Sequence, residues 1–353
     1  MSLRSSFLVA VGALFVLSAC GNSQPADDPS ASDASSGPQS VTLYSTRHYD
    51  ADQLIFDAFE AQTGIEVQAR EAGAAQLLET MRAEGDASPA DVILAADAGS
   101  LWRFKDAGLT QAVASETLET AIPARLQDAE NHWFGLAKRY RIIAYDPERL
   151  SAEQVSSMTN LTAAEMEGEI CVRSSSNVYN LSLMGELIDR LGSVGAQQWA
   201  DSVVGNMARD PSGGDTDQIR AIAAGACSAA IVNHYYWVRL SQSESEADLD
   251  VAASTMLSFA DAGNGTHTNV TAAGVAANAP NPEGAVAFIE FLASPEGQAL
   301  LVSDTKEFPV VAGVPLPAGL DGLPEIIESD LDLSTLGNNQ VEAQQIFDRA
   351  GWP

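Results

Sequence analysis

Short apolar runs alternate with segments of helical periodicity along the chain from residue 41 onwards. The apolar runs are typical of buried strands, and we predict strands at 41–44, 66–69, 90–95, 142–145, 170–172, 229–232 and 272–276. Apolar residues recur at helical spacing between them, which predicts helices at 50–63, 75–84, 100–107, 181–191, 217–224, 282–293 and 294–302. This alternation predicts a mostly parallel α/β architecture.

The number of predicted elements exceeds what one ordinary sheet holds, so we expect two α/β lobes. The chain is expected to cross between them near 136–139 and near 263–268. Lobe 1 then comprises 41–137 and 264–312, and lobe 2 comprises 138–263 and 313–353. A ligand bound between two such lobes is enclosed when they close about a hinge.

The first 40 residues do not fit this pattern. Arg4 precedes an apolar run at 7–17 that is too short to span a bilayer, and a small-residue cleavage site ends at Cys20. Residues 1–20 therefore resemble a bacterial lipoprotein signal, with Cys20 as the lipidated first residue of the mature chain. The alternative is an ordinary signal peptide that contains a cysteine. Residues 21–40 hold no aliphatic or aromatic side chain larger than alanine, which predicts a disordered tether.

The charge balance excludes one class of partner and restricts another. The chain has 48 acidic and 18 basic residues and a formal net charge of −30. Nucleic-acid binding needs a basic face, so it is not expected. So acidic a body is also repelled by anionic lipid, and we expect membrane contact only through the N-terminal lipid.

Four tyrosines follow predicted strands instead of lying within them: Tyr49, Tyr179, Tyr235 and Tyr236. In open α/β sheets ligands bind beyond the carboxyl ends of the strands. Phenolate oxygens gathered there are hard ligands suited to a hard cation. Neighbours in a strand point to opposite faces, so both members of the 235–236 pair reach one cavity only if the backbone turns there. These residues alone leave open a metal site and a site for an anion or small organic ligand.

Sequence signatures of catalysis are absent. The chain has no GlyXSerXGly, HisGluXXHis, phosphate-binding GlyXXXXGlyLys or dinucleotide-binding GlyXGlyXXGly motif. Ser174–Ser176 could hold the nucleophile of a secreted serine hydrolase, but none of the four histidines is spaced as its base. We expect these serines to form a hydrogen-bonding loop or helix cap, and we predict that the protein is not an enzyme.

Several blocks of the chain resemble the ferric-iron-binding proteins of bacterial ABC transporters. The similarity extends from about residue 41 to the C-terminus. Its blocks are ThrLeuTyrSerThrArgHisTyr (42–49), SerProAlaAspVal (88–92), AspAlaGlySerLeuTrp (97–102), IleCysValArgSerSerSerAsnValTyrAsn (170–180), AspProSerGlyGlyAspThrAspGlnIle (210–219), AlaAlaIleValAsnHisTyrTyr (229–236), GlyThrHis (265–267) and GluPheProVal (307–310). The last block stands where the family often has GluTyrProVal, and it is not a ligand motif.

This resemblance implies a two-lobe periplasmic-binding-protein fold of the Venus-flytrap type II class, with a hinge and a ligand cleft between the lobes. It implies capture of Fe³⁺ by Tyr49, Tyr179, Tyr235 and Tyr236, with His48 matching the histidine that some members use. Other members replace a side-chain ligand by carbonate or another small anion. The expected partners are an ABC-transporter permease and its ATPase, and the expected state is a monomer anchored by lipid in the periplasm.

Four phenolates and one Fe³⁺ carry a net charge of −1, which a buried site should compensate with a nearby cation. Arg139 and Arg239 are the candidates. Cys171 and Cys227 remain once Cys20 is set aside, in a compartment where disulfides persist. Each precedes a predicted ligand by eight residues, so two parallel neighbouring strands would bring both cysteines together, and we predict a disulfide.

Overall fold

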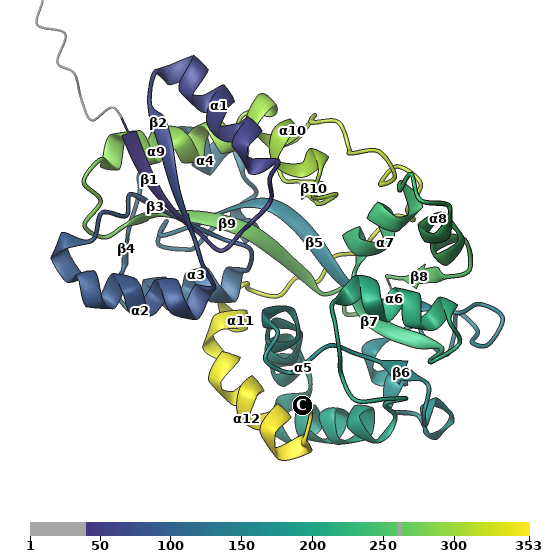
Figure 1. Cartoon of the computed structure of the whole chain (residues 1–353). Coiled ribbons are helices and arrows are strands. Elements are labelled where there is room, and N and C mark those ends of the chain that lie inside the picture. The colour runs from purple at the N-terminus through teal and green to yellow at the C-terminus, as the bar shows by residue number, and fades with distance from the viewer. Residues whose placement is uncertain (1–39, 260–262) are drawn as a thin grey trace, which may run out of the picture. The chain divides into compact units, whose positions relative to one another are not determined.

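The computed structural model describes residues 40–259 and 263–353, and Figure 1 labels their helices and strands. The strands are β1 (Ser40–Ser45), β2 (Glu66–Glu71), β3 (Val92–Ala95), β4 (Thr110–Gln111), β5 (Phe134–Tyr145), β6 (Ile170–Cys171), β7 (Ala229–Asn233), β8 (Met256–Ser258), β9 (Thr268–Ala276) and β10 (Phe308–Pro309). The α-helices are α1 (Asp52–Thr63), α2 (Ala74–Glu84), α3 (Ala98–Asp106), α4 (Glu116–Ala121), α5 (Val178–Gly205), α6 (Asp215–Ala223), α7 (His234–Ser241), α8 (Glu246–Ala253), α9 (Pro282–Leu292), α10 (Pro295–Ser303), α11 (Ser334–Asn338) and α12 (Gln340–Ala350).

The described strands pair in the order β2-β1-β3-β9-β5-β7-β6, with β4, β8 and β10 attached at the sides. The predicted, mostly parallel sheet is wrong. β1 runs parallel to β2 and β3, and β6 runs parallel to β7, but every pairing of β5 and β9 is antiparallel. The apolar runs of a buried parallel and a buried antiparallel strand look alike in sequence, which is why the pattern did not separate them.

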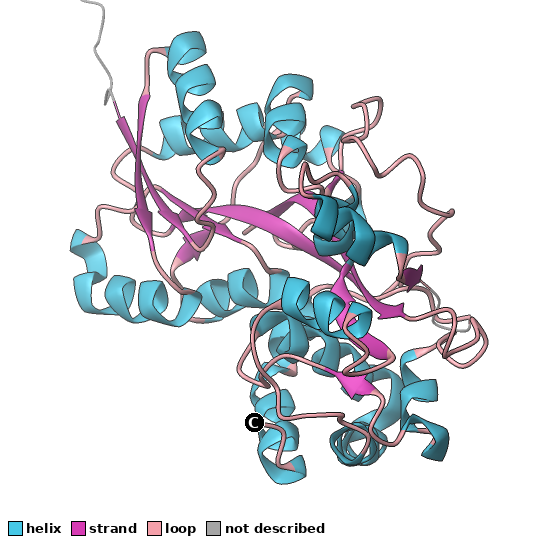
Figure 2. Ribbon diagram, turned by 45° about the vertical axis from the view of Figure 1, so that its right-hand side comes forward, coloured by secondary structure: helices cyan, strands magenta, loops and turns pink. Residues whose placement is uncertain are grey.

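Strand β5 connects two groups of packed elements, as Figure 1 shows. Its first half, 134–140, pairs with β9, and its second half, 141–145, pairs with β7. Elements beside β1, β3 and β9 enclose one apolar core, which includes Phe59, Phe104 and Phe288. Elements beside β6 and β7 enclose further apolar clusters on the two faces of those strands. Figure 2 shows helices on both sides of the strands.

Buried polar contacts join the two groups of elements. The carboxylate of Asp97 caps α3 through the backbone N–H of Ser100 (2.8 Å) and accepts a hydrogen bond from the hydroxyl of Ser182 on α5 (2.7 Å). Beside this contact α11 packs between α3 and α5, and the backbone of Leu336 lies against Gly99 and Gly185. Glycine lets the backbones approach here, since a Cβ at either position would meet the Leu336 carbonyl at 3.1 or 3.3 Å.

Most predicted elements occur within a few residues of their predicted bounds, and the differences have physical causes. Helix α5 extends well beyond the predicted 181–191, because the chain continues as helix after a kink at Gly192, whose φ of 69° suits glycine. The sequence reading did not find α4, α7, α8, α11 or α12. Each is short, and helices of one to three turns depend on tertiary packing more than on their own pattern.

Two sets of predictions are not tested by this structure. The signal peptide, Cys20 and all of the tether except Ser40 lie outside the described residues. The lobe boundaries remain predictions, although β5 and β9 do lie at the predicted crossings. In the described part of the chain no single helix is long and apolar enough to cross a membrane, and the one pair that passes by length and composition, α9 with α10, is bent by 72°.

Candidate metal centre

Tyr49 lies in the loop between β1 and α1 and is half-buried. The guanidinium of Arg47 lies 5.0 Å from the centre of its ring. Arg47 is itself held by a buried ion pair with Asp52 in the first turn of α1, at 2.7 Å. The ion pair therefore fixes the loop to the start of α1, and Arg47 in turn lies against the Tyr49 ring.

Tyr179 is the second residue of α5. The side chain of Asn177 caps this helix by accepting a hydrogen bond from the backbone N–H of Tyr179 at 3.0 Å. Asn is among the residues most favoured at this position, so the local sequence itself starts the helix there. Tyr179 thus lies at the N-terminal end of a helix, where the backbone dipoles favour negative charge on its phenol oxygen.

Tyr235 and Tyr236 lie in the first turn of α7. This helix begins at His234, directly after β7, where a turn leading out of the strand was predicted. Consecutive helical residues are about 100° apart around the axis, so two neighbouring side chains can reach one side of the helix, which a strand would not allow. Their ring centres are 4.5 Å apart. Tyr235 is buried and Tyr236 is half-buried.

The four tyrosines converge. The hydroxyl of Tyr235 donates a hydrogen bond to the hydroxyl oxygen of Tyr179 at 3.2 Å. The guanidinium of Arg239 lies 5.1, 5.3 and 5.7 Å from the ring centres of Tyr235, Tyr49 and Tyr236. One arginine therefore touches three of the rings, and a hydrogen bond joins the fourth to them.

Five arginines surround the phenols. The predicted pair, Arg139 and Arg239, is present: Arg139 is 2% exposed and lies 5.2 Å from the ring centre of Tyr179. The three that the sequence reading missed are Arg47 beside Tyr49 and Arg141 and Arg173 beside Tyr179.

Buried carboxylates hold most of these arginines in place. Asp215, at the start of α6, pairs with Arg141 at 2.7 Å and with Arg173 at 3.3 Å. Arg239 differs, because no carboxylate among the described residues pairs with it, and it donates instead to the carbonyl of Thr305 at 3.1 Å. Its charge is therefore the least compensated of the five.

The surroundings raise the pKa of three of the four phenols. Burial raises the pKa of Tyr235 well above its ordinary value, and the neighbouring Tyr179 adds to that effect. Burial and the nearby Tyr236 likewise raise the pKa of Tyr179, and burial and Glu307 raise that of Tyr49. Each of these three phenols becomes anionic only if a strong positive charge arrives, as a bound trivalent cation would provide.

Two histidines lie beside the tyrosines, and only one is available to a ligand. His48 is exposed and stacks on Tyr49 with ring centres 5.6 Å apart. His234 is buried, and its Nδ1 accepts the backbone N–H of Tyr140 at 3.2 Å, so its Nε2 carries the proton and donates to the carbonyl of Lys306 at 3.0 Å. Burial lowers the pKa of His234 to about 3, which makes it neutral.

Other candidate sites do not match this one. Ser174 and Ser176 hydrogen-bond to each other at 3.0 Å, and in the described residues no histidine bonds to either, as expected for a loop. A cavity of about 610 Å³ is lined by Asp189, Glu328 and Asp330, away from the tyrosines. The acidic residues of this cavity do not form a metal site, because residues 40–259 and 263–353 contain no group of three or more His, Cys, Asp or Glu side chains that could hold a metal ion. The tyrosine cluster is therefore the stronger candidate for a metal site.

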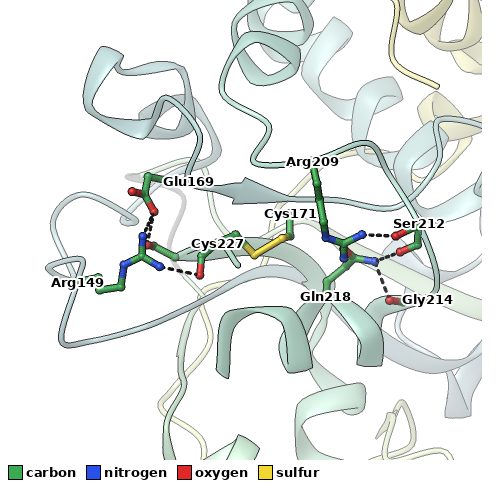
Figure 3. The surroundings of a disulfide bond; sticks show 9 residues. Arg149, Glu169, Cys171, Arg209, Ser212, Gly214, Gln218 and Cys227 are labelled. Atoms are coloured by element: carbon green, nitrogen blue, oxygen red, sulfur yellow. Dashed lines mark hydrogen bonds and ion pairs between the residues drawn. A yellow bond between two sulfur atoms is a disulfide. The ribbon is translucent and has the colours of Figure 1, made fainter. Parts of the chain in front are cut away.

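Eight residues before Tyr179 and Tyr235 in the sequence, Cys171 and Cys227 form a disulfide, with Cα atoms 5.9 Å apart. Figure 3 shows this bond between two hydrogen-bonded groups. On one side Arg149 donates to the carbonyl of Cys227 (3.2 Å) and to Glu169 (2.6 Å). On the other, Arg209 donates to Gln218 at 2.8 Å. The parallel pairing of β6 with β7 that the prediction required is present.

The missed arginines did leave a signal in the sequence. Arg141 lies two positions after the predicted Arg139 and directly before the apolar run 142–145 of β5, and arginine is almost never fully buried unless it is paired. Arg47 and Arg173 each lie a few residues before a tyrosine of the cluster. Asp215 and Glu307 gave no comparable signal, because their role depends on partners distant in sequence.

The chain belongs to the family of bacterial extracellular solute-binding proteins, whose family model matches residues 55–327. The predicted membership and the predicted two-lobe α/β fold class are confirmed by this match and by the solved structures below.

Three relatives illustrate the similarity. Iron uptake protein A1 of Synechocystis sp. is 40% identical over 353 residues, which cover 100% of this chain and 97% of that protein. A Trichodesmium protein solved in complex with iron and citrate ligands is 41% identical, with a TM-score of 0.84 over 89% of this chain and 100% of that one. The ferric binding protein from Campylobacter jejuni is 35% identical, with a TM-score of 0.85 over 89% and 100% of the two chains.

Proposed function

We propose that this chain captures ferric iron through the phenolate oxygens of Tyr49, Tyr179, Tyr235 and Tyr236. The observation that carries the proposal is the convergence of four phenols from three separate segments within a ring of five arginines. The names of the relatives support iron as the cargo, since they include an iron uptake protein and a ferric binding protein.

The chemistry of the donors fits Fe³⁺. Phenolate oxygen is a hard anionic ligand, and a trivalent ion is strong enough to remove a phenol proton whose pKa burial has raised. Binding therefore releases protons, and affinity rises with pH. Four phenolates and Fe³⁺ leave a charge of −1, which the uncompensated guanidinium of Arg239 balances. Reduction to Fe²⁺ weakens the bonds to anionic oxygens and offers a route of release.

Two groups are candidates for a further iron ligand beside the four phenolates. His48 stacks on Tyr49 and is exposed, so it can turn towards an ion bound at the phenols. A small anion such as carbonate is the other, and the Trichodesmium relative solved with iron and citrate supports an anion in this role. The arginines around the phenols would hold such an anion.

The cellular role follows from the family. Solute-binding proteins of this kind deliver cargo to an ABC-transporter permease and its ATPase, and we assign the same role to this chain without any enzymatic activity. The two lobes, 41–137 with 264–312 and 138–263 with 313–353, close on iron and open at the permease. The protein acts in the periplasm as a monomer, held to the membrane only by lipid on Cys20.

Titration of the purified, iron-free protein with Fe³⁺ supplied as a weak chelate tests the proposal. The expected result is a visible phenolate-to-iron charge-transfer band that saturates at one iron per chain. The alternative is that the protein is a receptor for an anion or small organic ligand. Calorimetry measures whether citrate or phosphate binds in the absence of iron, and so distinguishes this alternative from iron capture. Tight binding of an anion together with a colourless iron titration would refute the proposal.

A further inference from the structure

A three-residue segment just before β10, 305–307, contacts the surroundings of the tyrosines. The carbonyl of Thr305 accepts from Arg239 at 3.1 Å, and the carbonyl of Lys306 accepts from His234 at 3.0 Å. Both partners belong to α7, which carries the tyrosine pair: His234 is its first residue and Arg239 lies in its last turn. The segment thus holds α7 from one side.

The backbone of this segment is unusual. Lys306 has a φ of 58°, and in the described residues only one other non-glycine residue, Asn131, has a positive φ. Such conformations are sparsely populated and persist where surrounding contacts hold them, often at functional sites. In this conformation the carbonyls of Thr305 and Lys306 accept hydrogen bonds from α7, while the next side chain, Glu307, pairs with arginines beside the tyrosines.

That next side chain, Glu307, faces the other arginines. Its carboxylate lies 3.4 Å from Arg139 and 3.5 Å from Arg47, and these two guanidiniums lie against Tyr179 and Tyr49. The hydroxyl of Thr271 on β9 also lies 3.1 and 3.3 Å from its two oxygens. Glu307 is 4% exposed, so little water screens its charge from the site.

We propose that Glu307 is a positioning residue that holds Arg47 and Arg139 against the phenols and makes the centre favour Fe³⁺ over Fe²⁺. One fixed negative charge stabilises a trivalent ion more than a divalent ion at the same place. Without Glu307, Arg47 and Arg139 lose a shared counterion. Their positive charge then destabilises bound Fe³⁺ more than bound Fe²⁺. This inference rests on the proposed function, because it assigns the oxidation-state preference of the same site.

The test is the reduction potential of bound iron, followed through the visible band during a redox titration. In Glu307→Gln the ratio of the Fe³⁺ to the Fe²⁺ binding constant should fall roughly tenfold, which raises the one-electron midpoint potential by about 59 mV. Asp304→Asn is the matched control, because it makes the same change of charge at an exposed residue three positions away, and its potential should equal that of the wild type.

Two further variants separate charge from structure. Glu307→Asp keeps the charge, so the potential should stay near the wild-type value even if the affinities for both oxidation states fall together. Arg47→Gln removes the partner cation and should lower the potential, which tests the idea even if Glu307→Gln does not fold. An unchanged potential in Glu307→Gln, or the same shift in Glu307→Asp, overturns the inference. A wild-type protein that binds no Fe³⁺ would instead refute the proposed function.

Discussion

The hydroxyls of Tyr179 and Tyr235 are 3.2 Å apart, although 56 positions separate the two residues in the sequence. The disulfide between Cys171 and Cys227 spans the same separation of 56. Both pairs connect the segments that contain β6 and β7, which run in parallel. The disulfide and the phenol pair are therefore two cross-connections between the same two segments, eight residues apart.

Removing the disulfide should lower the free energy of unfolding. A loop of 56 residues predicts a stabilisation of about 4 kcal/mol in the chain-entropy model. Urea unfolding of Cys171→Ser/Cys227→Ser against the wild type measures it. The matching chemical test is thiol titration of the denatured, unreduced mature chain, after allowance for Cys20. Two free thiols per chain would show that the disulfide does not form.

The buried carboxylate of Glu186 should make stability depend on pH. Burial acts to raise its pKa, but His267 and Arg190 outweigh burial, and the net pKa lies below 4.5. A carboxylate with a lowered pKa in the folded state stabilises the fold above its unfolded pKa, and this contribution is lost as the pH falls through the folded value.

In Glu186→Gln the free energy of unfolding should therefore be lower by about 3 kcal/mol at pH 7, because His267 and Arg190 lose a buried partner. The difference from the wild type should shrink below about pH 4.5. Urea unfolding of the iron-free protein at several pH values measures this, with Asp189→Asn, an exposed position on the same helix, as the control. A difference that is constant with pH would contradict the account.

His48 and Tyr49 should differ as iron ligands. His48 is exposed, so water or an anion can replace it, and His48→Ala should lower Fe³⁺ affinity by about tenfold or less, roughly 1.4 kcal/mol. Tyr49→Phe removes an anionic oxygen and should cost far more. Competition against a chelator of known strength compares the two. Equal losses would mean that His48 is an essential ligand.

Cys20 should be the lipidated N-terminus. Cys20→Ala should leave an uncleaved precursor or a mislocalised protein, while the purified folded body binds iron as before, because Cys20 lies outside the body that carries the tyrosines. Fractionation and mass spectrometry of the two proteins measure this. A variant that is processed normally and stays attached to the membrane would show that the signal was misread.

The sequence allowed prediction of what local patterns encode, and it missed what depends on distant partners. Strands came from apolar runs, as at 229–232, and helices came from periodicity, as at 50–63, although the cap Asn177 and the start of α5 at Val178 were not predicted. The antiparallel course of β9 was missed, because an apolar run of this kind does not reveal the direction of its neighbour.

The candidate site shows the same division. The tyrosines could be identified because each follows a strand, but the choice of iron needed the family resemblance. Helix α7 was missed because it starts at the residue directly after the strand, with no Gly, Pro or other turn residue between them. Glu307 was set aside because its motif contains no ligand, and only the fold brings it to Arg47 and Arg139.

The central claim is that the phenols themselves bind the iron, and the most direct test is the visible spectrum and Fe³⁺ affinity of tyrosine-to-phenylalanine variants. Each change removes one oxygen and keeps the ring, so the fold should survive. Tyr145→Phe is the control, because Tyr145 also ends a strand but pairs there with Ala229, at the other end of β7 from the tyrosine pair. We predict a lost or shifted band and an affinity at least about 100-fold lower in Tyr235→Phe and Tyr236→Phe, a loss of roughly 2.7 kcal/mol, and no change in Tyr145→Phe. Folded Tyr235→Phe and Tyr236→Phe proteins with the wild-type band and affinity would contradict the account.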